Sequence, residues 1–217
     1  INKIHSRIYK FQHFDSSSYF LATSGGALFI DLKNKTYKSF THNPKDKANT
    51  IPPGFCRLVF KDNEGTILFG TATGGLSQLL IENGEFFIRP IAINTELLAV
   101  SKSYITSILQ LDKFTYLLGT GGEGIIVWNK KSNSFKRYDD RDGLPNSVIY
   151  SMLKDDYNNV WISTNQGLSQ FNTSTARFTN YKEIHGLLSR EFNLGASLKS
   201  RTGQLFFGGI SGLNYFH

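Results

Sequence analysis

The 217-residue chain has one cysteine, one methionine and five prolines. Cys56 has no second cysteine to pair with, so an internal disulfide is excluded. This does not identify the cellular compartment, because a domain with a large hydrophobic core needs no disulfide even in an oxidising space. No run of about 18 apolar residues is present that could cross a bilayer. The N-terminus carries no charged-then-apolar leader, so we expect any anchor or export signal to lie outside this segment.

The chain also lacks a cluster of basic residues. Lys and Arg number 24 against 17 Asp and Glu, a balance of +7 that would suit nucleic acid or anionic lipid if the positive charges were gathered. They are scattered singly or in pairs such as Lys130-Lys131, a distribution typical of a solvated face. We therefore expect no nucleic-acid partner.

Residues for catalysis or metal binding are equally sparse. No two of the five histidines stand at an i, i+2 or i, i+4 spacing, and no serine lies in a G-x-S-x-G context. Asp62, Asp155 and Asp156 fall at the same polar hairpin in their repeats, where we expect a carboxylate to cap the turn. We predict no catalytic residue, no metal and no cofactor.

Aromatic residues are abundant, with 18 Phe and ten Tyr, and this favours a β-rich core. Five segments share a small-residue turn between two short apolar strands. They are YFLATSGGALFID from Tyr19, ILFGTATGGLSQL from Ile67, YLLGTGGEGIIVW from Tyr116, VWISTNQGLSQF from Val160 and LFFGGISGLNYF from Leu205. The equivalent positions Thr23, Thr71, Thr120, Thr164 and Gly209 are 48, 49, 44 and 45 residues apart.

Each repeat also has an alternating segment before this core and, in three cases, an aromatic pair three residues apart after it, as in Phe178 and Tyr181. Four strands in a unit of this length predict an all-β propeller of four-stranded antiparallel blades, with about five blade repeats. A sandwich would show no repeating order of strand types.

We expect residues 1–217 to form a single propeller region, the C-terminal part of a larger propeller, with blades at 4–48, 49–97, 98–144, 145–189 and 190–217. The last blade stops after its third strand, so it must borrow a strand, for which INKIH at the N-terminus is a candidate, or leave an open edge that invites a homodimer.

The stretch GTGGEG, from Gly119 to Gly124, matches the G-x-G-x-x-G phosphate-binding fingerprint, which requires a helix directly after it. Ile125-Ile126-Val127-Trp128 follows instead, and side chains branched at Cβ favour a strand. We predict a repeated β-turn whose last glycine takes a positive φ or avoids crowding at the channel.

The segment from Asp142 to Tyr181 resembles the repeat of the two-component regulator propeller family, with a G-L-x-x-N linker, an acidic hairpin and a W-I-x-T-x-x-G-L core. Ser189 to Phe216 is similar to the segment that closes the last blade in that family. The first two repeats depart from the pattern, since Thr50-Ile51-Pro52-Pro53-Gly54-Phe55 replaces the linker.

The resemblance implies a role. Such propellers form the extracytoplasmic sensor part of bacterial membrane receptors, commonly hybrid histidine kinases and sometimes diguanylate cyclases. It implies a periplasmic location in an inner-membrane receptor, and a downstream β-sandwich and signalling domains of the same receptor as partners. A propeller hydrolase or lyase acting on polysaccharide and a protein-interaction scaffold are the alternatives.

Ligand recognition in a propeller combines short loops from several blades, each held by a rigid sheet. Amides suit hydroxyl-rich ligands and an arginine suits a carboxylate or sulfate, so we expect a carbohydrate or acidic small molecule. For Asn146 and Asn193, hydrogen bonding to the backbone of their own loop is an alternative role. The candidate ligand-binding residues are Tyr104, Asn146, Asn165, Gln166, Arg190, Glu191, Asn193 and Ser211.

Overall fold

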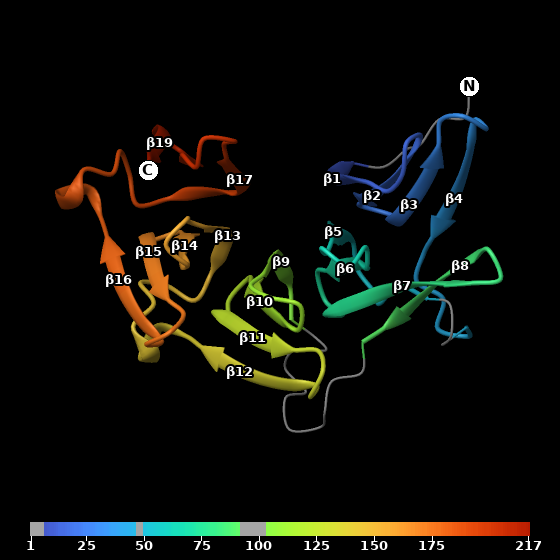
Figure 1. Cartoon of the computed structure of the whole chain (residues 1–217), viewed down its shortest axis with the longest axis horizontal. Coiled ribbons are helices and arrows are strands. Elements are labelled where there is room, and N and C mark those ends of the chain that lie inside the picture. The colour runs from blue at the N-terminus through green and yellow to red at the C-terminus, as the bar shows by residue number, and fades with distance from the viewer. Residues whose placement is uncertain (1–6, 47–49, 92–102) are drawn as a thin grey trace. The chain divides into compact units, whose positions relative to one another are not determined.

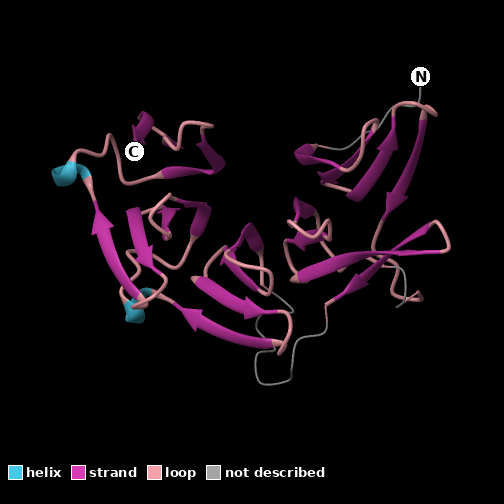
Figure 2. Cartoon of the chain, in the orientation of Figure 1, coloured by secondary structure: helices cyan, strands magenta, loops and turns pink. Residues whose placement is uncertain are grey.

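The computed structural model describes residues 7–46, 50–91 and 103–217. These residues form strands joined by loops, with two short 3₁₀ turns (Figures 1 and 2). They divide into two compact units, Ile1–Ile105 and Thr106–His217. Within the described ranges, no helix has the length and apolar character needed to span a membrane.

The first unit contains two four-stranded antiparallel sheets, each with its strands in chain order. We call each sheet a blade. The strands of blade 1 are β1 (Ile8–His13), β2 (Ser18–Thr23), β3 (Gly26–Asp31) and β4 (Thr36–Phe40), and those of blade 2 are β5 (Cys56–Lys61), β6 (Ile67–Thr71), β7 (Leu76–Glu82) and β8 (Glu85–Pro90).

The second unit contains three further sheets of the same topology. Blade 3 has β9 (Ile105–Gln110), β10 (Thr115–Thr120), β11 (Ile125–Asn129) and β12 (Ser134–Tyr138). Blade 4 has β13 (Ile149–Lys154), β14 (Asn159–Thr164), β15 (Gly167–Asn172) and β16 (Arg177–Tyr181). Blade 5 has β17 (Phe192–Lys199), β18 (Leu205–Gly209) and β19 (Gly212–Phe216).

These five sheets confirm the predicted all-β propeller architecture of about five blades. The predicted blade limits at residues 4, 48, 49, 97 and 98 lie outside the described residues, as does the segment INKIH. The single region 1–217 stays a prediction.

A buried threonine closes the turn between the second and third strands. Thr164 Oγ1 donates to Gly167 O at 2.8 Å and accepts from Gln166 N at 3.0 Å. Thr120 makes the same two bonds, and so do Thr23 and Thr71. The four threonines therefore have one structural role, and the predicted equivalence of these positions is confirmed.

The last glycine of each turn takes a positive φ, as predicted. In blade 3 Gly124 has φ 78°, and a Cβ there would meet the Tyr138 carbonyl oxygen at the end of β12. Only glycine fits, because a side chain would be both strained and blocked. GTGGEG is thus a hairpin turn between β10 and β11, and the predicted strand after it is confirmed.

The same glycine ties its blade to the chain that enters the next one. Gly124 N donates to Ser147 O at 2.8 Å, and Gly167 N donates to Arg190 O at 2.7 Å. In the first unit Gly75 N donates to Ser103 O at 3.2 Å. In blades 2, 3 and 4 the turn therefore positions the chain that enters the following first strand.

Lysines at the end of first strands also join neighbouring blades. Lys61 Nζ donates to Phe14 O at 2.7 Å in the first unit. In the second unit Lys199 Nζ donates to Lys154 O at 3.0 Å, and Lys154 Nζ lies 3.5 Å from Leu111 O. Some of the excess positive charge therefore belongs to lysines that hold neighbouring blades together.

The polar hairpin between first and second strands is capped by aspartate. Asp155 Oδ1 accepts from Tyr157 N and Asn159 N, both at 2.8 Å, and Asp62 accepts from the backbone in the same way. The capping role of these two residues is confirmed. Asp156 was assigned wrongly, because its carboxylate pairs with Lys199 Nζ at 2.6 Å and so joins blades 4 and 5.

The linker into blade 4 begins with a second capped turn. Asp139 caps η3 (Asp140–Asp142), accepting from Arg141 N and Arg141 Nε at 3.0 Å each. The hydrogen bonds and charge of Arg141 lower the pKa of Asp139 to about 2. The folded chain therefore stabilises the ionised form of the Asp139 carboxylate.

We expect Thr164→Val to lower the free energy of unfolding by about 1–3 kcal/mol, because Gly167 O and Gln166 N lose their partner in a buried turn. Urea denaturation followed by Trp161 fluorescence measures the change. Thr179→Val is the control, since Thr179 is exposed on β16 and should shift stability by less than about 0.5 kcal/mol. Equal effects of the two substitutions would contradict the role of the turn.

A second expectation concerns acid stability. A carboxylate whose pKa is depressed on folding contributes stability above its unfolded pKa, and this is lost as the pH falls through the folded value. Ionised Asp139 should therefore contribute to the free energy of unfolding above about pH 4, and this contribution should be lost near pH 2. Denaturation midpoints measured across this range should fall less in Asp139→Asn and in Arg141→Ala than in the wild type. Arg177→Ala, which removes an exposed arginine on β16, should keep the wild-type profile.

Candidate functional site

A β-bulge begins the first strand of several blades. In blade 1, Ile8 pairs with Thr23 and Lys10 with Ala22, so Tyr9 has no residue opposite it. The register shifts in the same way between Cys56 and Leu58 in β5, at Arg57, and between Ile149 and Ser151 in β13, at Tyr150. A larger irregularity in β17 includes Asn193. Because a bulge turns a side chain away from the regular pleat, we call Tyr9, Arg57, Tyr150 and Asn193 the bulge row.

In blades 1, 2 and 5, the residue just before the first strand accepts a backbone hydrogen bond at its carbonyl oxygen. Phe55 O accepts from Ala72 N at 3.0 Å, and Glu191 O accepts from Ile210 N at 3.1 Å. The carbonyl is occupied, while the side chain is left for other contacts. These entry positions are Arg7, Phe55, Tyr104, Val148 and Glu191.

In the first unit, bulge-row and entry side chains form one cluster. The rings of Tyr9 and Phe55 lie 5.4 Å apart, and those of Phe55 and Tyr104 lie 5.8 Å apart. Arg57 Cζ lies 4.8 Å from the Tyr9 ring centroid, and Arg57 is also hydrogen-bonded to Tyr104. We call these four residues the aromatic–arginine cluster.

This cluster combines apolar ring surface with a cation. Desolvation raises the pKa of Tyr104, and the Arg57 charge offsets only part of the effect, so the phenol stays neutral at ordinary pH. A neutral phenol both donates and accepts hydrogen bonds, and a guanidinium binds carboxylates or sulfates in a bidentate manner. The four side chains are all partly exposed, so a ligand has access to them.

In the second unit, five predicted site residues gather where hairpin turns of blades 4 and 5 meet the linker between them. The Gly167 N to Arg190 O bond ties one turn to the linker, and the Ile210 N to Glu191 O bond ties the other. They are Asn165, Gln166, Arg190, Glu191 and Ser211. Tyr150 lies near Glu191, whose charge adds to burial in raising the pKa of this tyrosine.

Some predicted residues already have partners within the fold. Arg190 Nε donates to Glu183 Oε1 at 2.8 Å on an exposed surface. Asn146 Oδ1 accepts from Val148 N at 2.7 Å, so it supports its own loop. Asn193 is an exposed residue of β17. Within the described ranges, Asn165 Oδ1 is buried without a hydrogen-bond partner.

Sequence reasoning missed Tyr9, Phe55, Arg57 and Tyr150. One signal was available, because Phe55 occupies the same repeat position as the predicted residue Tyr104. Tyr9, Arg57 and Tyr150 had no sequence signal, since a bulge arises from strand register and not from residue type.

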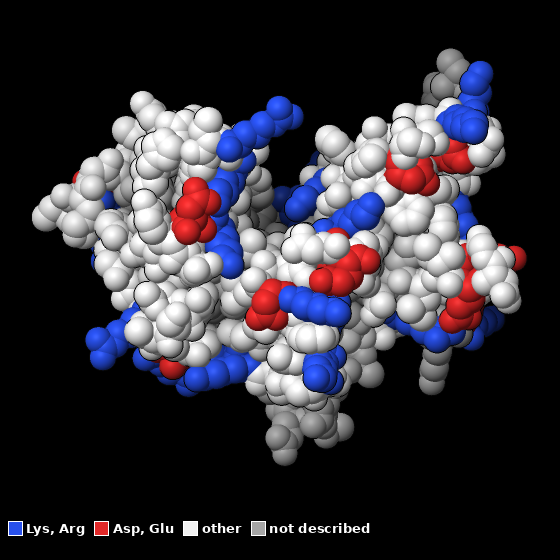
Figure 3. Space-filling view, in the orientation of Figure 1, with Lys and Arg blue, Asp and Glu red and all other residues white. Residues whose placement is uncertain are grey.

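The charged side chains on the face drawn in Figure 3 do not gather in one large patch. On the face drawn in Figure 3, Lys and Arg lie in separate small groups, several of them beside acidic side chains. In residues 7–46, 50–91 and 103–217, no group of three His, Cys, Asp or Glu side chains is placed to hold a metal.

The architecture defines the class: this is a blade-repeat propeller chain whose candidate binding side chains come from bulges and linkers. The family model of the two component regulator propeller matches residues 143–166, from the linker into blade 4 to the turn after β14. This match confirms the resemblance found in the sequence.

Three comparisons illustrate the relationship. The chain is 28% identical over 205 residues to histidine kinase P4 of Formosa agariphila, covering 93% of this chain and 15% of that protein. The extracellular domain of a hybrid two component system from B. thetaiotaomicron has a TM-score of 0.80 at 24% identity, over 98% of this chain and 28% of that one. Virginiamycin B lyase from Staphylococcus aureus has a TM-score of 0.65 at 13% identity, over 96% of this chain and 69% of that one. The chain thus spans less than a third of the kinase and of the extracellular domain.

Proposed function

We propose that this chain is a sensor module, part of the extracytoplasmic region of a bacterial transmembrane signalling receptor. The aromatic–arginine cluster carries the proposal, because partly exposed rings around a guanidinium suit ligand binding and the cluster contains no catalytic carboxylate pair. The similarity to a histidine kinase and to an extracellular domain supports the placement of the chain in the extracytoplasmic part of a receptor. In this reading the chain lies in the periplasm and is not itself an enzyme.

The ligand class follows from the cluster. Aromatic rings stack on the apolar faces of sugars, and Arg57 adds a site for a carboxylate or sulfate. We propose an acidic oligosaccharide. The receptor would pass the binding event to a downstream β-sandwich and signalling domains, either directly or through a homodimer.

The runner-up function is a hydrolase or lyase acting on polysaccharide, since a lyase shares the fold. A protein-interaction scaffold is the other alternative. Product released from a polysaccharide panel would favour the enzyme. Capture of a protein partner without small-molecule binding would favour the scaffold.

A calorimetric and thermal-shift screen of uronate and sulfated oligosaccharides, with neutral counterparts, tests the sensor function. An acidic oligosaccharide should raise Tm and bind more weakly at high salt. Arg57→Gln should weaken binding at least tenfold, and Tyr104→Phe several-fold, because the first removes the cation and the second a hydroxyl. Arg89→Gln removes the same charge from an exposed pair with Glu82 and should leave affinity unchanged.

The same titrations decide whether the second unit contributes. Weaker binding in Arg190→Ala and Asn165→Ala would extend the site to blades 4 and 5. If no acidic oligosaccharide raises Tm, or if Arg57→Gln and Arg89→Gln behave alike, the proposed ligand class is wrong.

A further inference from the structure

The turn between β6 and β7 of blade 2 is one residue longer than the turn between β14 and β15 of blade 4 (Figure 1). In blade 2, residues 72–74 separate Thr71 from Gly75. In blade 4, two residues separate Thr164 from Gly167. Because the threonine hydroxyl closes both turns, the additional residue enlarges an otherwise equivalent hairpin.

The residues that lead into blade 2 are unusual as well. Pro52, Pro53 and Gly54 directly precede Phe55, and we call residues 52–54 the proline segment. The two pyrrolidine rings fix their own φ angles, so the backbone of this segment has little freedom. Gly54 has a φ of 90°, a conformation that favours glycine.

The proline segment lies against the enlarged turn. Thr73 Oγ1 donates a hydrogen bond to Pro53 O at 2.7 Å. A Cβ on Gly54 would lie 2.8 Å from Thr73 Oγ1, and a Cβ on Gly74 would collide with the ring of Pro52. The two glycines therefore allow a close approach that side chains would prevent, and the hydroxyl of Thr73 bonds across it.

This contact is particular to blade 2. The turn of blade 3 is equally long, and its residue at the position of Thr73 is Gly122. Among the described residues, no atom lies within 4 Å of the place where a Cβ on Gly122 would stand. The contact in blade 2 therefore depends on Thr73 and the proline segment together, and not on the length of the turn.

The same turn holds the backbone beside two rings of the aromatic–arginine cluster. Ala72 N donates to Phe55 O at 3.0 Å. Gly75 N donates to Ser103 O at 3.2 Å, directly before Tyr104. The rings of Phe55 and Tyr104 lie 5.8 Å apart. The turn between β6 and β7 thus sets the spacing of these two entry residues.

The two threonines of this turn have different tasks. Thr71 is fully buried, and its hydroxyl closes the hairpin. Thr73 is exposed, and its hydroxyl bonds to the proline segment and not to the hairpin itself. Loss of an exposed hydrogen bond costs a fold little stability, so the Thr73 bond is better explained by what it holds in place.

We propose that Thr73 is a positioning residue, which acts through the proline segment to hold Phe55 ready for the ligand of the aromatic–arginine cluster. The Thr73 bond fixes the backbone two residues before Phe55, and the Ala72 bond fixes the Phe55 carbonyl. A ring that is held before binding loses less entropy when the ligand binds. The effect on the ligand rests on the proposed function, whereas the fixed position of the ring does not.

Fluorine NMR tests the position of the ring without any ligand. Phe55 of the 217-residue chain is replaced by 4-fluorophenylalanine, which should give one narrow signal. Thr73→Val keeps the shape of the side chain but removes the donor, so it should broaden or split this signal. Thr73→Ser retains the hydroxyl and should restore the single narrow signal.

Titration with an oligogalacturonate and with a sulfated oligosaccharide tests the effect on binding. Thr73→Val should weaken binding about three- to tenfold, the change that corresponds to one hydrogen bond, and Thr73→Ser should restore it. In a Phe55→Ala chain, Thr73→Val should cause no further loss, because it acts through Phe55. The Tm of Thr73→Val should stay within about 2 °C of the wild type.

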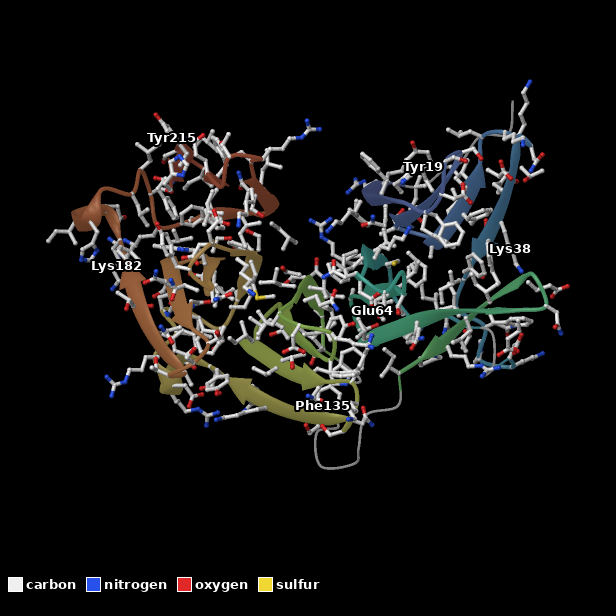
Figure 4. All side chains as sticks on the ribbon, viewed as in Figure 1. Tyr19, Lys38, Glu64, Phe135, Lys182 and Tyr215 are labelled. Atoms are coloured by element: carbon white, nitrogen blue, oxygen red, sulfur yellow. The ribbon has the colours of Figure 1, made fainter. Side chains whose placement is uncertain are left out.

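A pair of glycines in blade 2 supplies a matched control. Gly54 and Gly65 have φ angles of 90° and 86°, so an alanine is strained to a similar degree at either position. Gly65 follows Glu64, which Figure 4 labels, and a Cβ there would meet no described atom within 4 Å. Gly54→Ala should broaden the fluorine signal and weaken binding, whereas Gly65→Ala should do neither.

Three results would overturn the proposal. The first is an unchanged fluorine signal in Thr73→Val. The second is an equal effect of Gly54→Ala and Gly65→Ala on that signal, which would assign the effect to backbone strain in blade 2. The third is an additive loss of affinity from Thr73→Val and Phe55→Ala, which would make Thr73 a direct ligand contact.

The two proposals fail separately. If neither oligosaccharide binds while the fluorine signal responds to Thr73→Val and recovers in Thr73→Ser, the proposed ligand class is wrong and the positioning of Phe55 is supported. If Arg57→Gln weakens binding but Thr73→Val changes neither the affinity nor the signal, the ligand class is supported and the positioning role is wrong.

Discussion

The repeated architecture depends on one hydrogen-bonded turn, in which a buried threonine hydroxyl holds the carbonyl of a glycine with positive φ. In blade 4, the Thr164 bond to Gly167 closes the hairpin. The glycine N–H is thereby directed to Arg190 O at the entry to the next blade. A single local motif thus closes one hairpin and positions the following strand, so the fold propagates without a helix or a disulfide.

Because the backbone makes these structural bonds, the side chains at the same positions are free to vary. At Arg7, Phe55 and Glu191 the carbonyl oxygen makes the structural bond, while the type of side chain differs from one blade to the next. The bulges have the same property, because the register shift at a residue such as Arg57 turns its side chain away from the regular pleat. Binding chemistry can therefore differ between blades at little cost to the scaffold.

The sequence predicted the fold well because the turn leaves a visible trace, a threonine and a glycine at spacings of 44 to 49 residues. It predicted the candidate site only in part. Tyr104 and Glu191 were identified as linker residues, but Phe55 was hidden by the Pro52-Pro53 segment that replaces the usual linker. Tyr9 and Arg57 could not be found, because bulges depend on strand register. Asp156 was assigned wrongly because two neighbouring aspartates share a turn and only one can cap it.

Part of the excess of basic over acidic residues is explained by lysines that join neighbouring blades through backbone carbonyl groups. Lys61 and Lys199 place their ammonium groups on carbonyl oxygens of the preceding blade. A carbonyl is a neutral acceptor, so the Lys61 bond adds a positive charge without an acidic residue in return, whereas Lys199 is also paired with Asp156. Lys61 also lies 5.7 Å from the Phe14 ring centroid, a second neutral partner for the same cation. A net positive charge can therefore accumulate with the number of blades, independently of any polyanion that the surface binds.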